Sequence, residues 1–388
     1  MRFISQPIAK IKGNITYIMK IAMMVRALLT TPVPRDIGYS PSTIAAQVAE
    51  GLQKLGHEIT FFGPEGTKLE VAKIETKGLN HRVKDKDDFD QFLHDSDLFK
   101  KYIGALDDSI LAKDMLKRAK DGEFDCVMFH HFESAISYAA EFPSVPVVHV
   151  LHDYIDSDRK GVILQHATPN QHFVSISNSQ RNTAPDINYL KTVYNGIDIE
   201  QFDYNPEPGD YLFFSGRITP SKGVAEAIQV AKATKRMLLL AGPLAKADYA
   251  YFDEYVRPHL DDQILYLGML EKEQLVKYYQ RAAALLVPIQ WEEPFGLTMA
   301  EANACGTPVI ALKRGAVPEL IVDSFNGFVA TNIAEMILAV KQLHTIKRRN
   351  CRDHVKKFFT IEKMCKNYEK ALLTLVDKPT KKPVKRIK

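Results

Sequence analysis

Short runs of apolar residues alternate along the chain with stretches in which apolar residues recur every three or four positions. The runs 20–25, 57–62 and 146–151 have the length of buried strands, and residues 44–55 repeat apolar positions at helical spacing. Continuous apolar strands separated by helices are typical of a parallel sheet that is covered on both faces. The first half of the chain therefore predicts a doubly wound α/β domain.

A turn-rich loop separates the first predicted strand from the first predicted helix. This loop, residues 31–40, holds two prolines and Gly38, and such residues favour turns. Ser42 or Thr43 is suited to cap the helix, because its side-chain oxygen can accept from a free amide of the first turn. Gly56 is expected to end the helix.

The same alternation restarts after residue 210 and predicts a second α/β domain. Residues 203–210, which include two prolines, are the expected linker between the domains. The predicted strands of the second domain are 211–214, 237–241, 264–267, 283–287 and 309–312. A final helix around 361–375 carries its apolar residues on one face, so it is expected to pack against a domain.

Length and composition suit two globular domains. The chain has 388 residues, of which 46% are hydrophobic and 25% charged, enough for two sizeable cores. A net charge of +4 excludes a broad nucleic-acid surface. The four cysteines show no C-x-x-C spacing, so they are interpreted as reduced thiols of a cytoplasmic protein.

The two ends of the chain differ from the rest. Residues 1–18 are basic and irregular, and Met19 is suited to be a start, so they are interpreted as an extension. The apolar stretch that follows is broken by Lys20 and Arg26, which excludes a membrane span and a signal peptide. Residues 378–388 hold six basic and no acidic side chains. This tail is expected to be solvated, and peripheral contact with an anionic membrane stays open.

The stretch from Trp291 to Pro308 carries the most specific chemistry. Pro294 delays helix formation after the strand 283–287, and a short helix is predicted from Leu297 to Ala304. The amides of Gly296, Leu297 and Thr298 would then be free at the helix start, where a phosphate binds favourably.

Two acidic residues flank this predicted anion site. Glu293 lies in the loop before the helix and Glu301 lies within the helix. Each carboxylate can accept hydrogen bonds from hydroxyl groups on one side of a bound phosphate. The combination of an anion site with two hydroxyl-binding acids suits a nucleotide-sugar.

Two cations follow the first strand of the second domain. Arg217 and Lys222 lie in the stretch S-G-R-I-T-P-S-K-G, and a guanidinium fork with a mobile ammonium suits a diphosphate. The stretch lacks the order of a Walker A loop, and the chain has no G-x-G-x-x-G, so a dinucleotide dehydrogenase loses its main support.

Histidines and acidic triplets supply weaker candidates. His152 follows the strand 146–151, and the carboxyl ends of parallel strands gather binding residues. His130 and His131 also follow a strand and are weaker candidates. The D-x-D triplets at 85–87, 95–97 and 156–158 are interpreted as chance in acid-rich segments, so no metal site is predicted.

The spacing of Glu293 and Glu301, in E-P-F-G-L-x-x-x-E-A-x-A-C-G-T-P-V, resembles the signature of family 4 retaining glycosyltransferases. The segments S-I-S-N, N-G-I-D, G-R-x-x-x-x-K-G and G-x-x-P-E, which ends in Glu319, are also similar to family segments. The resemblance extends from about Lys20 to Leu375. Glu319 itself is expected to cap or pair locally.

The resemblance implies the GT-B fold, an α/β architecture of two Rossmann-like, doubly wound parallel-sheet domains that face a central cleft. The first would span residues 19–204, completed by a C-terminal helix at about 360–376, and would bind the acceptor. The second would span residues 209–359 and bind the nucleotide-sugar donor.

The resemblance also implies the activity and the roles of individual residues. The activity would be that of a hexosyltransferase, which moves a sugar from a nucleotide-diphosphate-sugar to an acceptor hydroxyl with retention of anomeric configuration, in glycan, glycolipid or polysaccharide biosynthesis. The implied roles are diphosphate binding by Arg217 and Lys222, sugar binding by Glu293 and His152, ribose binding by Glu301, and base contacts by Met269 and Leu270. Gly38 stands where the family has a Gly-Gly pair near the donor phosphates.

No metal or other cofactor is expected beyond the donor substrate. The acceptor is expected to be a glycan, a lipid or a small molecule, and the sequence names neither it, the sugar nor the nucleotide. Two alternatives stay open: a GT-B-fold nucleotide-sugar epimerase, and a non-catalytic nucleotide-sugar-binding protein.

Overall fold

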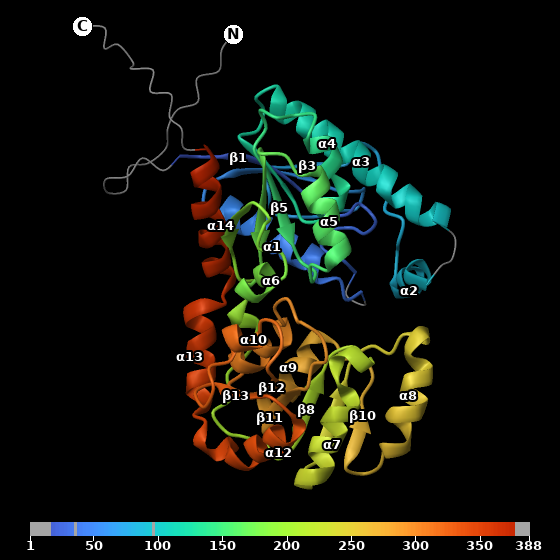
Figure 1. The fold of residues 1–388 in the computed structure, drawn as a ribbon, viewed down its shortest axis with the longest axis vertical. Coiled ribbons are helices and arrows are strands. Elements are labelled where there is room, and N and C mark those ends of the chain that lie inside the picture. The colour runs from blue at the N-terminus through green and yellow to red at the C-terminus, as the bar shows by residue number, and fades with distance from the viewer. Residues whose placement is uncertain (1–16, 35–36, 95–97, 377–388) are drawn as a thin grey trace, which may run out of the picture.

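The computed structural model describes residues 17–34, 37–94 and 98–376. Two α/β domains lie one above the other in Figure 1, and the chain crosses back to the first domain in its last helix. The basic tail, most of the expected extension and the triplet 95–97 lie outside the described residues. Within the described ranges, no helix has the length and apolar content needed to cross a bilayer.

The described part of the first domain contains a seven-stranded parallel sheet in the order β3-β2-β1-β4-β5-β6-β7. The strands are β1 (Lys20–Met24), β2 (Glu58–Phe62), β3 (Lys73–Glu75), β4 (Cys126–Phe129), β5 (Val147–Leu151), β6 (Gln171–Ser175) and β7 (Tyr189–Thr192). The helices are α1 (Ser40–Lys54), α2 (Lys86–His94), α3 (Leu98–Lys120), α4 (Ile136–Ala139), α5 (Ser157–His166) and α6 (Asn178–Asn182).

The described part of the second domain contains a six-stranded parallel sheet in the order β10-β9-β8-β11-β12-β13. The strands are β8 (Leu212–Ser215), β9 (Leu238–Ala241), β10 (Ile264–Tyr266), β11 (Ala284–Val287), β12 (Val309–Leu312) and β13 (Gly327–Ala330). The helices are α7 (Val224–Thr234), α8 (Tyr249–Tyr255), α9 (Lys272–Arg281), α10 (Leu297–Ala304), α11 (Val317–Leu320), α12 (Ile333–Gln342) and α13 (Arg348–Phe358), after which the chain continues into α14 (Ile361–Val376).

The order of the strands in each sheet indicates where a ligand would bind. In each sheet the order reverses next to the first strand of the domain, between β1 and β4 and between β8 and β11. A crevice opens at the carboxyl ends of the strands on either side of such a reversal, and ligands bind there. The predicted class, α/β with two doubly wound parallel sheets, is confirmed.

The last helix belongs spatially to the first domain. The thiol of Cys365 in α14 lies 3.6 Å from the carbonyl oxygen of Gln47 in α1, and Glu369 lies 3.3 Å from His57. Met364, Cys365, Tyr368 and Leu372 form the buried face of the helix. In Figure 1, α14 runs beside the first domain, as the apolar periodicity of 361–375 indicated.

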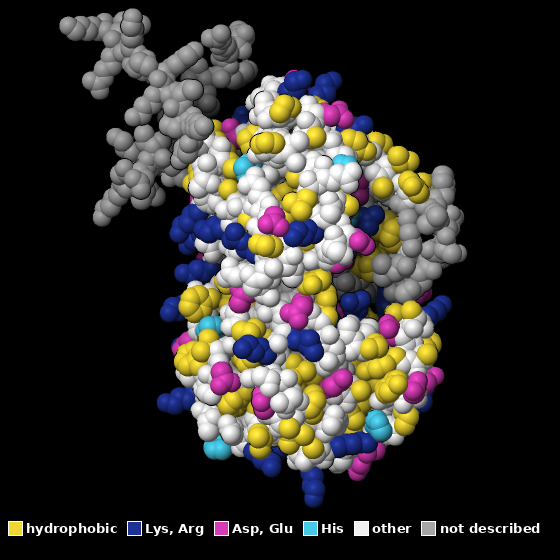
Figure 2. All heavy atoms as spheres, viewed as in Figure 1, with side chains coloured by type: hydrophobic (Ala, Val, Ile, Leu, Met, Phe, Trp, Pro, Cys, Tyr) yellow, Lys and Arg dark blue, Asp and Glu magenta, His cyan; other side chains and the backbone are white. Residues whose placement is uncertain are grey.

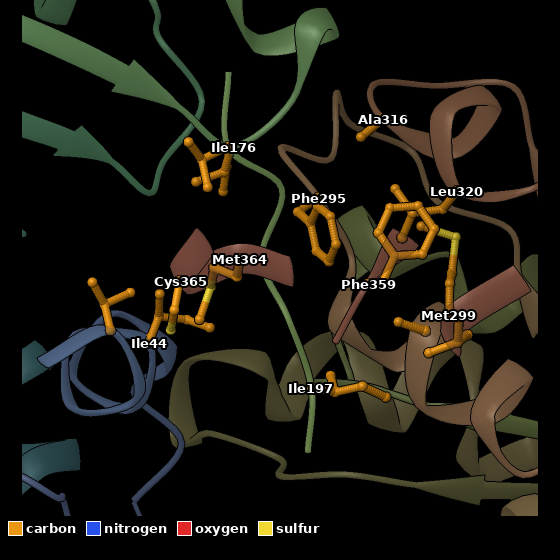
Figure 3. Close-up of a cluster of buried hydrophobic side chains, with 14 of the residues drawn as sticks. Ile44, Ile176, Ile197, Phe295, Met299, Ala316, Leu320, Phe359, Met364 and Cys365 are labelled. Atoms are coloured by element: carbon orange, nitrogen blue, oxygen red, sulfur yellow. The ribbon is translucent and has the colours of Figure 1, made fainter. Parts of the chain in front are cut away.

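An apolar core continues from one domain into the other beneath the cleft. Figure 3 shows Ile44 and Ile176 of the first domain together with Phe295, Met299 and Phe359 of the second part of the chain, all buried. Removing such side chains from water contributes about 1.5–3 kcal/mol each. The two domains are therefore joined by packing as well as by the linker.

One local prediction was wrong. Helix α1 begins at Ser40 rather than after Ser42 or Thr43, because Pro41 fits the first turn of a helix, where its missing amide costs nothing. Gly196 of the N-G-I-D segment does not have a positive φ. A glycine is needed there because the backbones approach closely: a Cβ on Gly196 would lie 2.5 Å from the backbone of Thr360.

Candidate active site

A cleft of about 740 Å³ lies between the domains and is lined by the loops that follow β1, β5, β8 and β11. In Figure 2 the surface is hollowed between the two domains. The predicted site residues that line this cleft are Gly38, His152, Arg217, Lys222, Met269, Glu293, Gly296, Leu297 and Thr298. Residues from widely separated segments thus meet in one place.

The start of α10 forms one wall of the cleft. Gly296 precedes the helix with φ +91°, and a Cβ at this position would lie 2.4 Å from the terminal methyl group of Met299. Only glycine adopts this conformation without strain. Within the described residues, the amides of Leu297 and Thr298 have no hydrogen-bond acceptor in the chain. They are therefore available to an anion in the cleft.

Lys222 and Glu293 form an ion pair at the centre of the second-domain wall. The Lys222 Nζ lies 2.6 Å from Glu293 Oε2, and the two side chains are 21% and 13% exposed. The Lys222 ammonium also lies 5.1 Å from the centre of the Trp291 ring. The ion pair compensates both charges in a partly desolvated position, where a lone charge would be costly.

Arg217 contrasts with Lys222, although both follow β8. Its side chain is exposed at the rim, and it makes no ion pair or hydrogen bond with any described residue. Arg217 is thus a free cation beside the first turn of α10. Both the guanidinium and the free amides favour negative charge in this part of the cleft.

His152 faces the cleft from the first domain. Its Nε2 lies 2.9 Å from Nδ1 of the buried His130, and the two rings stack with centroids 5.1 Å apart. Burial lowers the pKa of His152 to about 4 and the pKa of His130 well below its ordinary value. Both imidazoles are therefore neutral at pH 7, so His152 can hydrogen-bond a hydroxyl but does not bring a positive charge.

Glu301 and Leu270 do not line the cleft. Glu301 accepts a hydrogen bond of 3.1 Å from the Tyr279 hydroxyl, which lies 3.0 Å from Ser215 Oγ, and burial raises the pKa of Glu301. Leu270 packs against the core, whereas Met269 is 39% exposed and reaches the cleft. The expected base contact of Leu270 is therefore not supported, because its apolar side chain turns into the protein.

Several cleft residues were missed by the sequence analysis. On the first-domain side these are Arg26, Tyr39, Phe89 and Phe92, none of which belongs to a motif of fixed spacing. Arg26 Nε lies 3.5 Å from the buried Asp108. Tyr279, which is fully buried and lies behind the second-domain wall, was also missed, since an aromatic residue at helical spacing indicates a core position. Only the burial of its hydroxyl beside a carboxylate distinguishes it.

The acidic triplets have structural roles where they are described. Asp156 caps α5 by accepting from the amide of Arg159 at 2.8 Å, and Asp85 accepts from the amide of Asp88 at 2.9 Å. Within the described ranges, no three His, Cys, Asp or Glu side chains are placed to hold a metal ion. The expectation that no metal takes part stays a prediction.

Both halves of the chain match known sequence families. Residues 42–201 match Glycosyltransferase Family 4, and residues 197–358 match Glycosyl transferases group 1. The D-inositol 3-phosphate glycosyltransferase of Mycolicibacterium smegmatis is 28% identical over 50% of this chain and 47% of the relative. The lipopolysaccharide 1,2-N-acetylglucosaminetransferase of Salmonella typhimurium is 25% identical over 41% of this chain and 47% of the relative. The chain thus spans about half the length of these curated relatives.

Solved structures resemble the whole fold. AviGT4, a glycosyltransferase involved in avilamycin A biosynthesis, superposes with a TM-score of 0.62 at 20% identity, over 92% of this chain and 98% of the other. HepE of Anabaena, solved with UDP and glucose, gives a TM-score of 0.65 at 15% identity, over 92% of this chain and 100% of the other. At these identities the likeness establishes the fold, and that fold is GT-B.

Proposed function

The chain belongs to the group 1 glycosyltransferases, and we propose that it transfers a sugar from a nucleotide-diphosphate-sugar to an acceptor hydroxyl with retention of anomeric configuration. The observation that carries the proposal is the convergence of Arg217, the Lys222–Glu293 ion pair and the free amides of α10 on one cleft. This set combines groups that bind a diphosphate with a carboxylate that binds sugar hydroxyls.

The second-domain wall supports the departing diphosphate. As the bond from the anomeric carbon to the phosphate oxygen breaks, negative charge develops on that oxygen. Arg217 and the amides of Leu297 and Thr298 form a preorganised positive environment for it, to which Lys222 adds its charge once it turns from Glu293. Preorganised donors of this kind stabilise a transition state more than water does, because they need no reorientation.

Glu293 binds the sugar in this scheme. Its carboxylate is held in place by Lys222 in the free protein, before the donor arrives. Sugar hydroxyls can donate to its remaining lone pairs, and Lys222 can turn from Glu293 towards the diphosphate. The neutral His152 contacts the same sugar from the first domain and orients it.

No protein nucleophile is required for the proposed step. The acceptor oxygen attacks the anomeric carbon on the face that the diphosphate leaves, and its proton passes to an oxygen of the departing phosphate. One carbon–oxygen bond forms as another breaks, so charge is balanced. Configuration is retained because attack and departure take place on the same face. Arg217 and Lys222 can carry the leaving-group charge, so we expect turnover without a divalent metal.

The acceptor side is the first-domain wall, where Tyr39, Phe89 and Phe92 border the cleft. Aromatic faces of this kind suit the apolar face of a sugar ring. We infer an acceptor hydroxyl on a glycan, a lipid or a small molecule. Relatives that act on inositol phosphate and on lipopolysaccharide are consistent with biosynthesis of glycans or glycolipids.

A thermal-shift screen tests the donor site first. UDP, GDP, ADP and their common sugar conjugates are added without metal and then with magnesium. We expect one nucleotide to raise Tm selectively, since a ligand that binds only the folded state stabilises it. UDP has priority because HepE was solved with it. Arg217→Ala should abolish the shift because it removes a cation that lines the cleft, and a protein that responds to no nucleotide would contradict the assignment.

Product analysis then separates the remaining activities. A transferase releases nucleoside diphosphate in proportion to glycosylated acceptor, whose anomeric proton coupling reports configuration. An epimerase changes the sugar without any acceptor. A binding protein shows the thermal shift and releases nothing, and inversion of configuration would contradict the proposed mechanism.

A further inference from the structure

Glu319 connects the two domains, contrary to the local contacts expected from its motif. It lies on α11 in the second domain. Its carboxylate accepts from the amides of Asn178 at 2.8 Å and Ser179 at 2.7 Å, and from the Tyr194 hydroxyl at 2.7 Å. All of these donors lie in the first domain. One carboxylate therefore receives three short hydrogen bonds across the domain boundary, and bonds to a charged acceptor are among the stronger ones.

On the second-domain side, Glu319 is attached to the loop that carries Glu293. The amide of Ala316 donates to the carbonyl oxygen of Glu293 at 2.8 Å, and the amide of Gly315 donates to Glu292 Oε2 at 2.6 Å. A Cβ at Gly315 would lie 2.4 Å from the amide nitrogen of Glu293. The segment that leads into the helix of Glu319 is therefore in direct backbone contact with Glu293.

On the first-domain side, the same contact is attached to His152. Asn178 and Ser179 begin helix α6, which also contains the buried Gln180. The Gln180 side-chain amide donates to the carbonyl oxygens of Leu151 at 3.0 Å and Asp153 at 2.7 Å. These are the residues on either side of His152, so the position of His152 follows that of α6.

Aromatic packing joins the two domains at the same interface. The Tyr194 ring lies 6.3 Å from the Phe295 ring and 5.6 Å from the Phe359 ring. Phe295 stands between Pro294 and Gly296 in the cleft wall. Figure 3 shows Ile176 of the first domain opposite Phe295, with Ala316 close by. Packing and hydrogen bonds thus join the same two segments.

We propose that Glu319 is a positioning residue that holds His152 and Glu293 at the separation needed to bind one donor sugar. The two side chains come from different domains, so their separation depends on how the domains are set. Misplacement of a reacting group by about 1 Å can lower the rate about 100-fold. The kinetic consequence of this proposal rests on the proposed transferase function. The interdomain link itself does not depend on that function.

Kinetics of three variants test the positioning role. Glu319→Ala removes every acceptor, and Glu319→Gln keeps one oxygen but turns an amide donor towards a backbone amide. The matched control is Glu335→Gln, because Glu335 accepts from the amide of Thr331 at 2.7 Å and its hydroxyl at 2.8 Å within the second domain. We expect Glu319→Ala to lower kcat about 10–100-fold, Glu319→Gln to lie between it and the wild type, and Glu335→Gln to leave kcat unchanged.

Nucleotide binding distinguishes positioning from general damage. The groups proposed to bind the diphosphate, namely Arg217, Lys222 and the amides of α10, lie in the second domain. Glu319→Ala should therefore bind the nucleoside diphosphate within about twofold of the wild type, because none of these groups is removed. A similar loss of nucleotide binding and kcat would overturn the positioning role. An unchanged kcat would overturn it as well.

A distance measurement tests the link without any activity. The native cysteines are buried, so spin labels can be placed selectively at Leu106→Cys on α3 and Leu338→Cys on α12, which are 57% and 54% exposed. We expect Glu319→Ala to shift or broaden the interdomain distance distribution, and Glu335→Gln to preserve it. An unchanged distribution would overturn the proposal.

The two measurements also separate this proposal from the proposed function. A changed distance in a protein that transfers no sugar would retain the interdomain link and reject the transferase. If Glu319→Ala does not fold, Tyr194→Phe removes only one of the hydrogen bonds to Glu319. It should then give a smaller change of the same kind in distance and in kcat, and no change in either would overturn the proposal.

Discussion

The two walls of the cleft are built in different ways. The residues proposed to bind the diphosphate in the second-domain wall come from two short stretches, 215–223 and 291–298, and include the free backbone amides of Leu297 and Thr298. The first-domain wall is assembled from side chains of three segments: the loop between β1 and α1, helix α2, and the residues that follow β5. Binding of a diphosphate by backbone amides needs special backbone angles and fixed spacing, and that requirement is visible in sequence. Side-chain contacts to a variable acceptor impose no such spacing.

Loss of Arg217 is expected to have the largest effect. Arg217→Ala removes the free cation of the second-domain wall and should lower kcat/KM about 100- to 1000-fold, which corresponds to about 2.7–4 kcal/mol. Its side chain is exposed, so Tm should stay nearly unchanged. The control is Arg257→Ala, another exposed arginine of this domain. If the two variants had equal kinetics, an arginine in the cleft would be no more important for activity than an arginine elsewhere on the surface.

A pair of glycine variants tests the comparison directly. Gly296→Ala forces alanine into φ +91° against Met299, which costs about 1–3 kcal/mol and displaces the amides of α10. Gly38→Ala on the opposite wall has no atom of the described residues within 4 Å of the new Cβ. We expect nucleotide affinity to fall about tenfold or more in the first and to stay unchanged in the second, by calorimetric titration. A large loss in Gly38→Ala would show that backbone also binds the donor from the first domain.

The features that could be predicted from the sequence follow the same division. Helix α10 was predicted with its observed bounds, Leu297–Ala304, because Pro294 and Gly306 determine its ends locally. The strands were recognised because burial on both faces requires continuous apolar runs. The partners of Glu319 were missed because they lie 125 to 141 residues earlier in the chain. A carboxylate that pairs locally and one that joins two domains look the same in sequence.

A smaller effect is expected from a residue behind the second-domain wall. Tyr279→Phe removes the hydroxyl that donates to Glu301 and lies beside Ser215. A typical hydrogen bond contributes about 0.5–1.5 kcal/mol, so the KM for the donor should rise about 2- to 12-fold while kcat changes less. Tyr278→Phe on the same helix is the control, because its side chain only packs against the core. A fall in kcat at constant KM would instead assign Tyr279 to the chemical step.

The smallest effect on activity is expected from the protonation of His152. Its pKa in the folded state is about 4, lowered by burial, whereas an unperturbed histidine titrates near 6.5. Between these values the unfolded chain binds more protons, so stability is present above about pH 6.5 and is lost as pH falls towards 4. The imidazole that faces the sugar is neutral throughout the range above pH 5. We therefore expect kcat/KM to show no step near pH 6.5, while the urea midpoint declines below that pH.

His152→Asn retains a hydrogen-bonding side chain without this titration, so it should flatten part of the stability decline. A step in kcat/KM near pH 6.5 that disappears in His152→Asn would mean that the first-domain wall supplies a charge to the reaction, and the contrast between the two walls would then fail.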